Sequence, residues 1–257
     1  MHLKNLFDRL PSTELDFAQF NALRTSDSDD PATVQRGRTD AFDFLLDLSR
    51  PTSPYYNRAL SRQPGSCSAA DLSQLPARVV SVELVPSQMT AASAEGLLAG
   101  GFRPAYQLCY LVAQPTGLLD VQHDVTRLKP TDADFFFDLL QMSGAAFAPE
   151  KRLRKKGYYC TSLFQVFVAR AANGDPAAWA TMFVNADTAF FGNSFTLPPF
   201  RGAGMHSALL AARWNAAAAL GLTAAYTDVE HGSQSHCNCE RAGFRTLSVN
   251  TIWVRSV

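Results

Sequence analysis

The stretch FTLPPFRGAGMHSALL, residues 195–210, contains the end of a strand, a Pro-Pro turn, two glycines and the start of a long helix, in that order. Gly202 and Gly204 allow the backbone to approach a ligand closely. The first amides of a helix have no acceptor within it, and the helix dipole adds positive potential at that end. The stretch therefore predicts an anion site, with pyrophosphate as the expected anion. The alternative is an ordinary strand-to-helix turn with Arg201 at the surface.

The sequence around this stretch predicts alternating strands and helices. Residues 163–170 and 177–185 are two expected strands joined by a hairpin at Asn173 and Gly174, and 188–197 is a third. A helix is expected over 204–220, because strong helix formers fill it and Gly221 follows as a C-cap. A strand over 223–230, a short helix over 235–242 and a strand over 244–254 complete this half, which predicts a mixed α/β sheet.

The first half of the chain has a similar but weaker pattern. The apolar stretches 15–23 and 41–49 are predicted as helices separated by the polar loop 25–40, followed by strands over 78–85 and 106–112 with a helix over 90–98 between them. Residues 93–112 align without gaps on residues 235–254, and Gly101 falls on Gly243. This internal repeat indicates two related domains, with boundaries at 1–120 and 121–257.

In the second half the sequence resembles the GNAT superfamily of acyl-CoA-dependent N-acetyltransferases. Their cofactor motif runs Arg or Gln, two residues, Gly, one residue, then Gly or Ala; Arg201 and Gly204 match it, while His206 replaces the small residue. Downstream, GSQSHCNCERAGF (232–244) resembles the second cofactor-side segment of the family. The likeness covers about residues 125–257, and PYYNR at 54–58 resembles the first half of two-domain members.

The resemblance implies a fold of two GNAT-like domains, each a mixed, mainly antiparallel sheet flanked by helices, with the first domain degenerate. It implies that the second domain is an N-acetyltransferase that binds acetyl-CoA as cosubstrate. The glycine turn 201–204 and the helix start after it would form a cradle for the pyrophosphate. A backbone amide at the end of the strand before this cradle would polarise the thioester carbonyl. The expected cofactor-binding residues are Phe195, Thr196, Leu197, Arg201, Gly202, Ala203, Gly204, Met205, His206, Ser235 and Asn238.

The acceptor expected from the resemblance is a primary amine of a small molecule or peptide. A general base must take a proton from it, and the strand end offers Glu230, with Asp228 and His231 as alternatives. Members of the family often have a tyrosine acid four residues before the Gly-Phe pair, where this chain has Cys239. We predict direct attack by the amine with Glu230 as base. Glu230 could equally be a solvated carboxylate, and Cys239 a small buried side chain.

Composition excludes several classes of partner. Lys and Arg (23) balance Asp and Glu (23), so no global field favours nucleic acid or an anionic membrane. No apolar run is long enough to span a membrane, and the charged start does not resemble a signal peptide, which predicts a cytoplasmic protein. The five scattered cysteines argue for reduced thiols. The sequence leaves the oligomeric state undecided, with a homodimer as one alternative.

Three further interpretations compete with this one. His231, His236, Cys237 and Cys239 lack the spacing of a structural zinc site, so no metal is predicted. GAGMHS imitates part of a dinucleotide motif, but the third glycine is Ser207 and too little chain follows for a Rossmann sheet. A non-catalytic acyl-CoA-binding module is compatible with the absence of the tyrosine acid.

The basic run KRLRKK (151–156) is either a solvated helix face or a contact for an acidic acceptor.

Overall fold

The computed structural model describes residues 3–62 and 67–255, which form two compact units. Unit 1 takes in the described residues of 1–110 together with 229–231 and the end of the chain from 246. Unit 2 consists of residues 111–228 and 232–245. The units therefore do not simply follow chain order, since the C-terminal strand packs with the first part of the chain.

Unit 1 is a mixed sheet with the strand order β1-β2-β3-β4-β11-β5. Neighbouring pairs β1/β2, β2/β3 and β4/β11 are antiparallel, whereas β3 and β4 run parallel. Its elements are α1 (Leu3–Thr25), β1 (Val34–Arg38), β2 (Phe42–Asp47), β3 (Arg58–Ser61), α2 (Ala69–Ser73), β4 (Ser81–Leu84), α3 (Ala91–Ala99), β5 (Phe102–Ala113) and β11 (Arg245–Arg255), with 3-10 turns η1 (Pro31–Thr33) and η2 (Pro86–Gln88).

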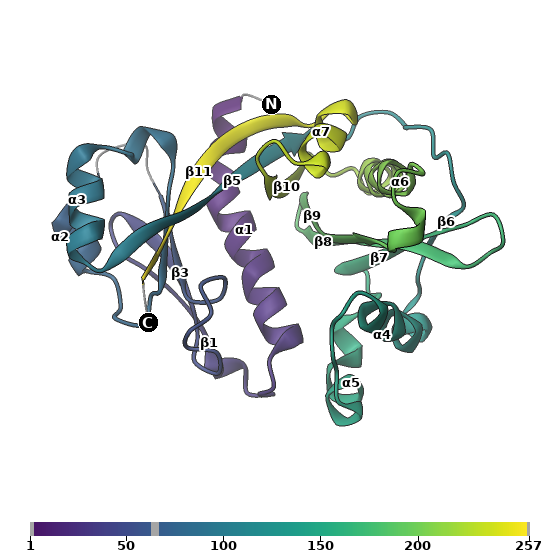
Figure 1. Ribbon diagram of the computed structural model, residues 1–257, viewed down its shortest axis with the longest axis horizontal. Helices are drawn as coiled ribbons and strands as arrows, with labels where there is room; N and C mark the ends of the chain where they lie inside the picture. The colour runs from purple at the N-terminus through teal and green to yellow at the C-terminus, as the bar shows by residue number, and fades with distance from the viewer. Residues whose placement is uncertain (1–2, 63–66, 256–257) are drawn as a thin grey trace. The chain divides into compact units, whose positions relative to one another are not determined.

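Helices pack against unit 1's sheet through two separate hydrophobic cores. The helices concerned, α1 in one core and α2 and α3 in the other, lie beside these strands in Figure 1. The apolar residues of α1, including Leu15 and Ala18, pack with Val34 and Leu45 of β1 and β2. The other core joins the sheet to α2 and α3, and its largest member is Trp253 of β11. Burying apolar surface in this way is the main stabilising term of the fold.

Unit 2 is a sheet of order β10-β9-β8-β7-β6, antiparallel except for the parallel pair β9/β10. In Figure 1, α6 lies on one side of these strands and α4 on the other. The elements are β6 (Val125–Arg127), η3 (Pro130–Asp132), α4 (Ala133–Met142), α5 (Pro149–Lys155), η4 (Lys156–Tyr158), β7 (Phe164–Arg170), β8 (Pro176–Asn185), β9 (Thr188–Thr196), η5 (Pro198–Phe200), α6 (Met205–Ala219), β10 (Ala224–Glu230) and α7 (Gln234–Arg241).

Most predicted elements are present, but the prediction for residues 41–49 is wrong. This stretch was expected to be a helix, and it forms β2, a strand hydrogen-bonded on both sides to β1 and β3. Five of the six residues of β2 are buried, Asp43 and Asp47 among them, so burial does not alternate along the strand, and its apolar residues Phe42, Phe44, Leu45 and Leu46 form a short run. Such a run has neither a helical nor a strand period and therefore does not distinguish a buried strand from a helix. Part of the expected loop 25–40 likewise forms β1.

The internal repeat corresponds to a repeated local structure. In each copy a helix ends, a glycine with positive φ follows, and a strand begins: α3, Gly101 (φ +80°) and β5, then α7, Gly243 (φ +98°) and β11. A positive φ favours glycine, because other residues have a Cβ that clashes there. The mixed α/β fold class, with mainly antiparallel strands flanked by helices, is confirmed. Among the described helices, none has the length and apolar character needed to span a membrane.

Candidate functional site

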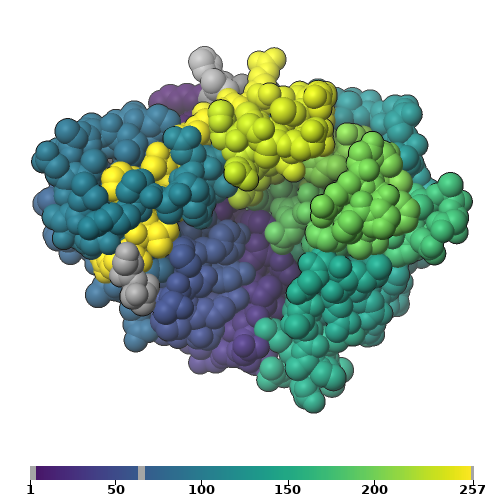
Figure 2. All heavy atoms as spheres, viewed as in Figure 1, coloured from purple at the N-terminus to yellow at the C-terminus, as the bar shows by residue number. Residues whose placement is uncertain are grey.

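A cavity of about 660 Å³ in unit 2 contains most of the predicted cofactor residues. The end of β9 and the turn after it form one side, and the first residues of α6 and α7 form the other. The lining residues are Ser194, Thr196, Phe200, Arg201, Gly202, Gly204, Met205, His206, Ser207, Gln234, Ser235 and Asn238. Of the predicted set, Phe195, Leu197 and Ala203 do not line it. In Figure 2 the yellow-green atoms, which belong to the part of the chain around α7, are exposed on the face shown.

The start of α6 has the geometry of an anion site. Gly202 and Gly204 both have positive φ, +79° and +81°, and Gly204 is the N-cap. The first helical hydrogen bond runs from Ala208 N to Gly204 O at 3.0 Å, so the amides of residues 204–207 precede the helical ladder. His123 packs behind this turn, with Nε2 2.8 Å from Ala203 O. The backbone amides and helix dipole are therefore held in place for a negative ligand.

Helix α7 brings a second N-terminus to the same cavity. Ser233 caps it, with Oγ accepting from His236 N at 3.2 Å. Asn238, one turn into the helix, donates from Nδ2 to His206 Nδ1 at 3.2 Å, which ties α7 to the first turn of α6. Burial, reinforced by the charge of Arg213, lowers the pKa of His206 to about 4, so the imidazole is neutral at neutral pH.

Strands β9 and β10 separate near the cavity. Their parallel pairing covers three residue pairs, from Thr188↔Ala224 to Phe190↔Tyr226, while β9 continues along β8 to Thr196. A β-bulge interrupts that second pairing, because Thr181 pairs with Gly192 and Ala180 with Ser194, which leaves Asn193 as an extra residue. The end of β9 thus has an edge that β10 does not cover.

Residues 195–197 form the end of the strand where a backbone amide is predicted to polarise the thioester carbonyl, and the amide of Leu197 is already used within the sheet. Leu197 N donates to Ala177 O of β8 at 2.9 Å. Successive amides of a strand point to opposite edges, so the amide of Thr196 points to the edge away from β8. The Thr196 carbonyl accepts from Arg201 Nε at 3.3 Å, and Thr196 lines the cavity. Of residues 195–197, Thr196 therefore has the suitable orientation.

The bulge is fixed by a residue that the sequence interpretation missed. Arg213 of α6 is 2% exposed, and its Nη1 donates to Thr181 O (3.2 Å) and Gly192 O (3.3 Å), the two residues at the register shift. Burial lowers its pKa to about 10, an effect that nearby Cys239 opposes, so Arg213 remains charged at neutral pH. In the sequence, the position of Arg213 as a single cation within an Ala- and Leu-rich helix was the sign that it has a structural role. No such sign in the sequence marked His123 or Gln234 as site residues.

The predicted catalytic residues lie outside the cavity lining. Cys239 is on α7 in unit 2 and is 2% exposed. Glu230 is the exposed last residue of β10 and, with residues 229 and 231, belongs to unit 1. Their roles stay predictions. Among the described residues, no three His, Cys, Asp or Glu side chains form a group suited to a metal; His236 Nδ1 accepts from Gly232 N at 3.1 Å.

Two other sequence features have structural roles. In PYYNR, Asn57 accepts from Asp47 N at 3.0 Å and donates to Arg50 O at 2.7 Å, while Tyr56 lies under the Arg50 guanidinium. In the basic run, Arg152 donates to Asp138 at 2.7 Å and Lys156 pairs with Asp134, so α5 is attached to α4. This arrangement favours the interpretation of the run as a helix surface.

The comparisons with known proteins are informative at the level of structure. No known family model and no curated protein matches the chain. A GCN5-related N-acetyltransferase from Kribbella flavida matches with a TM-score of 0.66 and 17% identity, over 97% of this chain and 95% of that one. A putative GNAT-family acetyltransferase from Novosphingobium aromaticivorans matches with a TM-score of 0.53 and 20% identity, over 95% and 99%.

A third match also has two domains in one chain. A tandem GNAT protein from the clavulanic acid biosynthesis pathway has a TM-score of 0.52 and 13% identity, over 94% of each chain. The mainly antiparallel sheet of unit 2 differs from the parallel sheet of a Rossmann domain, which removes support from the dinucleotide interpretation. Along nearly its whole length, this chain has the fold of the GNAT acetyltransferases.

Proposed function

We propose that this protein transfers an acetyl group from acetyl-CoA to a primary amine. The observation that carries the proposal is the cavity of unit 2, at which the N-termini of α6 and α7 meet beside the uncovered end of β9. The amides and dipoles of two helix starts attract an anion, and the pyrophosphate of CoA is the group expected there. Its binding residues would be the glycine turn 201–204, the first turn of α6, Ser235 and Asn238.

The uncovered edge of β9 suits the acetyl end of the cosubstrate. We infer that the amide of Thr196 donates to the thioester carbonyl oxygen, where negative charge develops during attack. The amine nitrogen bonds to the carbonyl carbon, the C–S bond breaks, and sulfur leaves as the CoA thiolate. The proton lost by the nitrogen goes to Glu230, directly or through water, and the thiolate takes a proton from solvent or from Cys239.

The test is release of free CoA thiol from acetyl-CoA in the presence of a panel of amines, amino acids and peptides. An active amine should give one thiol and one acetylated product per turnover. Glu230→Gln should lower kcat by about 10²- to 10⁴-fold, the range of general-base catalysis, and leave CoA affinity nearly unchanged. Glu150→Gln, on α5, is a matched control and should keep full activity. Equal activity of Glu230→Gln and wild type removes Glu230 from the mechanism.

A non-catalytic acyl-CoA-binding module is the second candidate. It is favoured by Cys239, a buried thiol where the resemblance places a tyrosine acid. Calorimetry separates the two, because this candidate binds acetyl-CoA at the unit 2 cavity but gives no thiol with any amine. Under acetyl transfer, Cys239→Ser should lose less than tenfold in activity, since a hydroxyl keeps the size and the donor. An acetyl group trapped on Cys239 in mass spectrometry would instead establish a thiol intermediate.

A further inference from the structure

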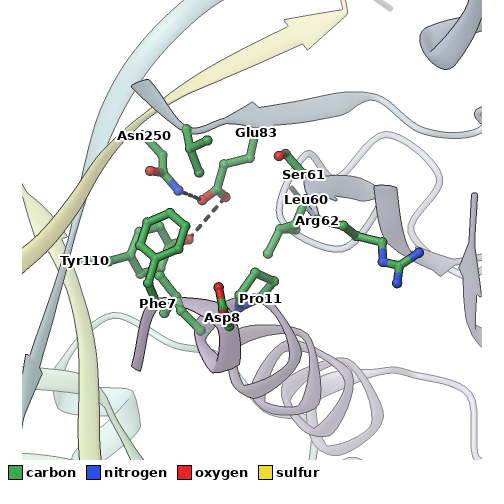
Figure 3. Close-up of a pocket in the computed structure, with 11 residues that line it drawn as sticks. Phe7, Asp8, Pro11, Leu60, Ser61, Arg62, Glu83, Tyr110 and Asn250 are labelled. Atoms are coloured by element: carbon green, nitrogen blue, oxygen red, sulfur yellow. Dashed lines mark hydrogen bonds between the residues drawn. The ribbon is translucent and has the colours of Figure 1, made fainter. Parts of the chain in front are cut away.

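A smaller cavity lies in unit 1, between the start of α1 and the strands β3, β4, β5 and β11 (Figure 3). Its volume of about 20 Å³ holds a single group of the size of a water molecule or an ammonium. Apolar side chains of Phe7, Leu10, Pro11, Leu60 and Val85 form much of its wall. Polar groups lie on the strands, where Glu83 and Asn250 meet, and on α1, where Asp8 lies across from them (Figure 3).

The polar side of the cavity is formed around the carboxyl group of Glu83. Glu83 is 4% exposed; Oε1 accepts from Asn250 Nδ2 at 2.7 Å and Oε2 from Tyr110 OH at 3.1 Å, as the dashed lines in Figure 3 show. A carboxylate has about four acceptor positions, so these two bonds leave acceptor capacity toward the cavity. Both neighbours serve as donors, which favours an ionised Glu83.

The charges of this cluster do not balance. Glu14 and Glu83 are both buried, and they share one buried cation, Arg58. Arg58 pairs closely with Glu14, whereas its Nη1 lies 4.0 Å from Glu83 Oε2. An uncompensated buried charge is strongly unfavourable. Accordingly, burial raises the pKa of Glu83, although Arg58 and the Asn250 hydrogen bond oppose the shift. The cluster is neutral when Glu83 holds a proton or when a second cation replaces that proton.

The other charged residues at the cavity leave room for such a cation. Arg62 points away from Glu83 in Figure 3; its Nε lies 3.4 Å from Asp43, and its Nη1 donates to Thr39 O at 3.2 Å. Asp8 of α1 lines the cavity with a carboxylate whose side chain is 48% exposed. Lys4 Nζ already pairs with Asp8 Oδ2 at 2.7 Å, so the attraction of a positive group into the cavity comes from Glu83.

We propose that this cavity binds the terminal ammonium group of an unbranched primary alkylamine, with Glu83 as its counter-ion. The ammonium occupies the space beside Glu83, and the adjoining methylene groups lie outside that space, on the side where Asp8 is partly exposed. A quaternary ammonium is too large for this volume, and an alcohol of the same length lacks the charge. The site lies within unit 1, is separate from the cavity of unit 2, and does not depend on acetyl transfer.

The proposal predicts that binding releases a proton. Free Glu83 holds a proton below its raised pKa and loses it when the ammonium arrives, so affinity should increase with pH until Glu83 is ionised in the free protein. The charged and titratable groups beside Glu83 are Glu14 on α1, Arg58 on β3 and Tyr110 on β5. Asp8 and Arg62 also line the cavity, but Asp8 pairs with Lys4, and Arg62 points away from Glu83 and pairs with Asp43. Arg58 stays charged in both states, so the released proton belongs to the pair formed by Glu83 and the ligand.

Calorimetry of the full chain with n-propylammonium chloride tests this. Titrations in two buffers of different ionisation enthalpy should show a site that releases up to one proton per amine. Glu83→Gln removes the charge with little change of shape, and it should weaken binding at least tenfold and abolish proton release. Glu95→Gln, an exposed carboxylate of α3, is the matched control and should bind like wild type.

Val85→Leu adds a methylene to a space of about 20 Å³ and should also abolish binding, which gives an answer if Glu83→Gln does not fold. The proposal is overturned by the absence of binding at millimolar amine, by equal affinity of Glu83→Gln, or by equal binding of n-propanol. It is also overturned by Val85→Leu binding as wild type does. Because no acetyl-CoA is added, the outcome is independent of the outcome for acetyl transfer.

Discussion

At the scale of single residues, the two glycines before α6 determine how close a ligand can come. Gly204→Val forces a branched residue into φ +81°, and its Cβ would lie 3.3 Å from His123 Nε2. We expect at least a tenfold loss of CoA affinity, about 1.4 kcal/mol, measured by calorimetry. Gly174→Val in the β7–β8 turn is a matched control, because φ is +85° and the space is open, yet it lies outside the cavity lining. Undiminished affinity in folded Gly204→Val would remove the cradle from the proposal.

His206 gives a residue-scale prediction about pH. Its folded pKa of about 4 lies below the ordinary value of 6.5, so between these values the unfolded state binds a proton that the folded state does not. Its contribution to stability is complete above pH 6.5 and is lost as pH falls toward 4, about 1–2 kcal/mol between pH 7.5 and 5. Urea unfolding at both pH values should show a smaller fall in His206→Gln than in wild type. An equal fall in both proteins would contradict the assignment.

At the scale of elements, Arg213 links α6 to the bulge between β8 and β9. Arg213→Met leaves the carbonyls of Thr181 and Gly192 without this donor, so we expect a loss of about 1–3 kcal/mol in urea unfolding. Amide exchange at Asn193 and Ser194 should become faster. Arg245→Met, an exposed cation of unit 2, should change stability by less than about 0.5 kcal/mol. A more stable Arg213→Met protein would mean that desolvation of the guanidinium outweighs its hydrogen bonds.

The elements also show which parts of the fold the sequence predicts. α6 and the β7–β8 hairpin were predicted correctly because their signals are local: helix formers ending at Gly221, and Asn173-Gly174 in a turn. β2 was predicted as a helix because the run FDFLL has no period. In the site, the glycine cradle follows from local chemistry, but the contacts of Arg213 and His123 join residues far apart in sequence. No local pattern encodes such contacts.

At the scale of the whole molecule, the return of β11 to unit 1 makes the second half dependent on the first. Residues Ser81–Leu84 of β4 pair with Thr251–Val254, and Ile252 and Trp253 are buried in unit 1. A 122–257 fragment therefore carries an unpaired apolar strand and should aggregate. A 111–245 fragment lacks most of that strand and should be the more soluble of the two. Size-exclusion chromatography of both fragments checks this, and a monomeric 122–257 beside an aggregated 111–245 contradicts it.

The same return of β11 has a consequence for synthesis on the ribosome. β4 is complete at Leu84, but its neighbour β11 begins at Arg245, so about 160 further residues must be translated before they pair. At 5–20 residues per second this takes about 8–30 s. During that interval one edge of β4 is open and Glu83 lacks Asn250. The strands of unit 2 lie within that later stretch of chain, so the half that is made first is completed last. Nascent chains that end before residue 245 should therefore be substrates for chaperones and proteases that recognise exposed strands.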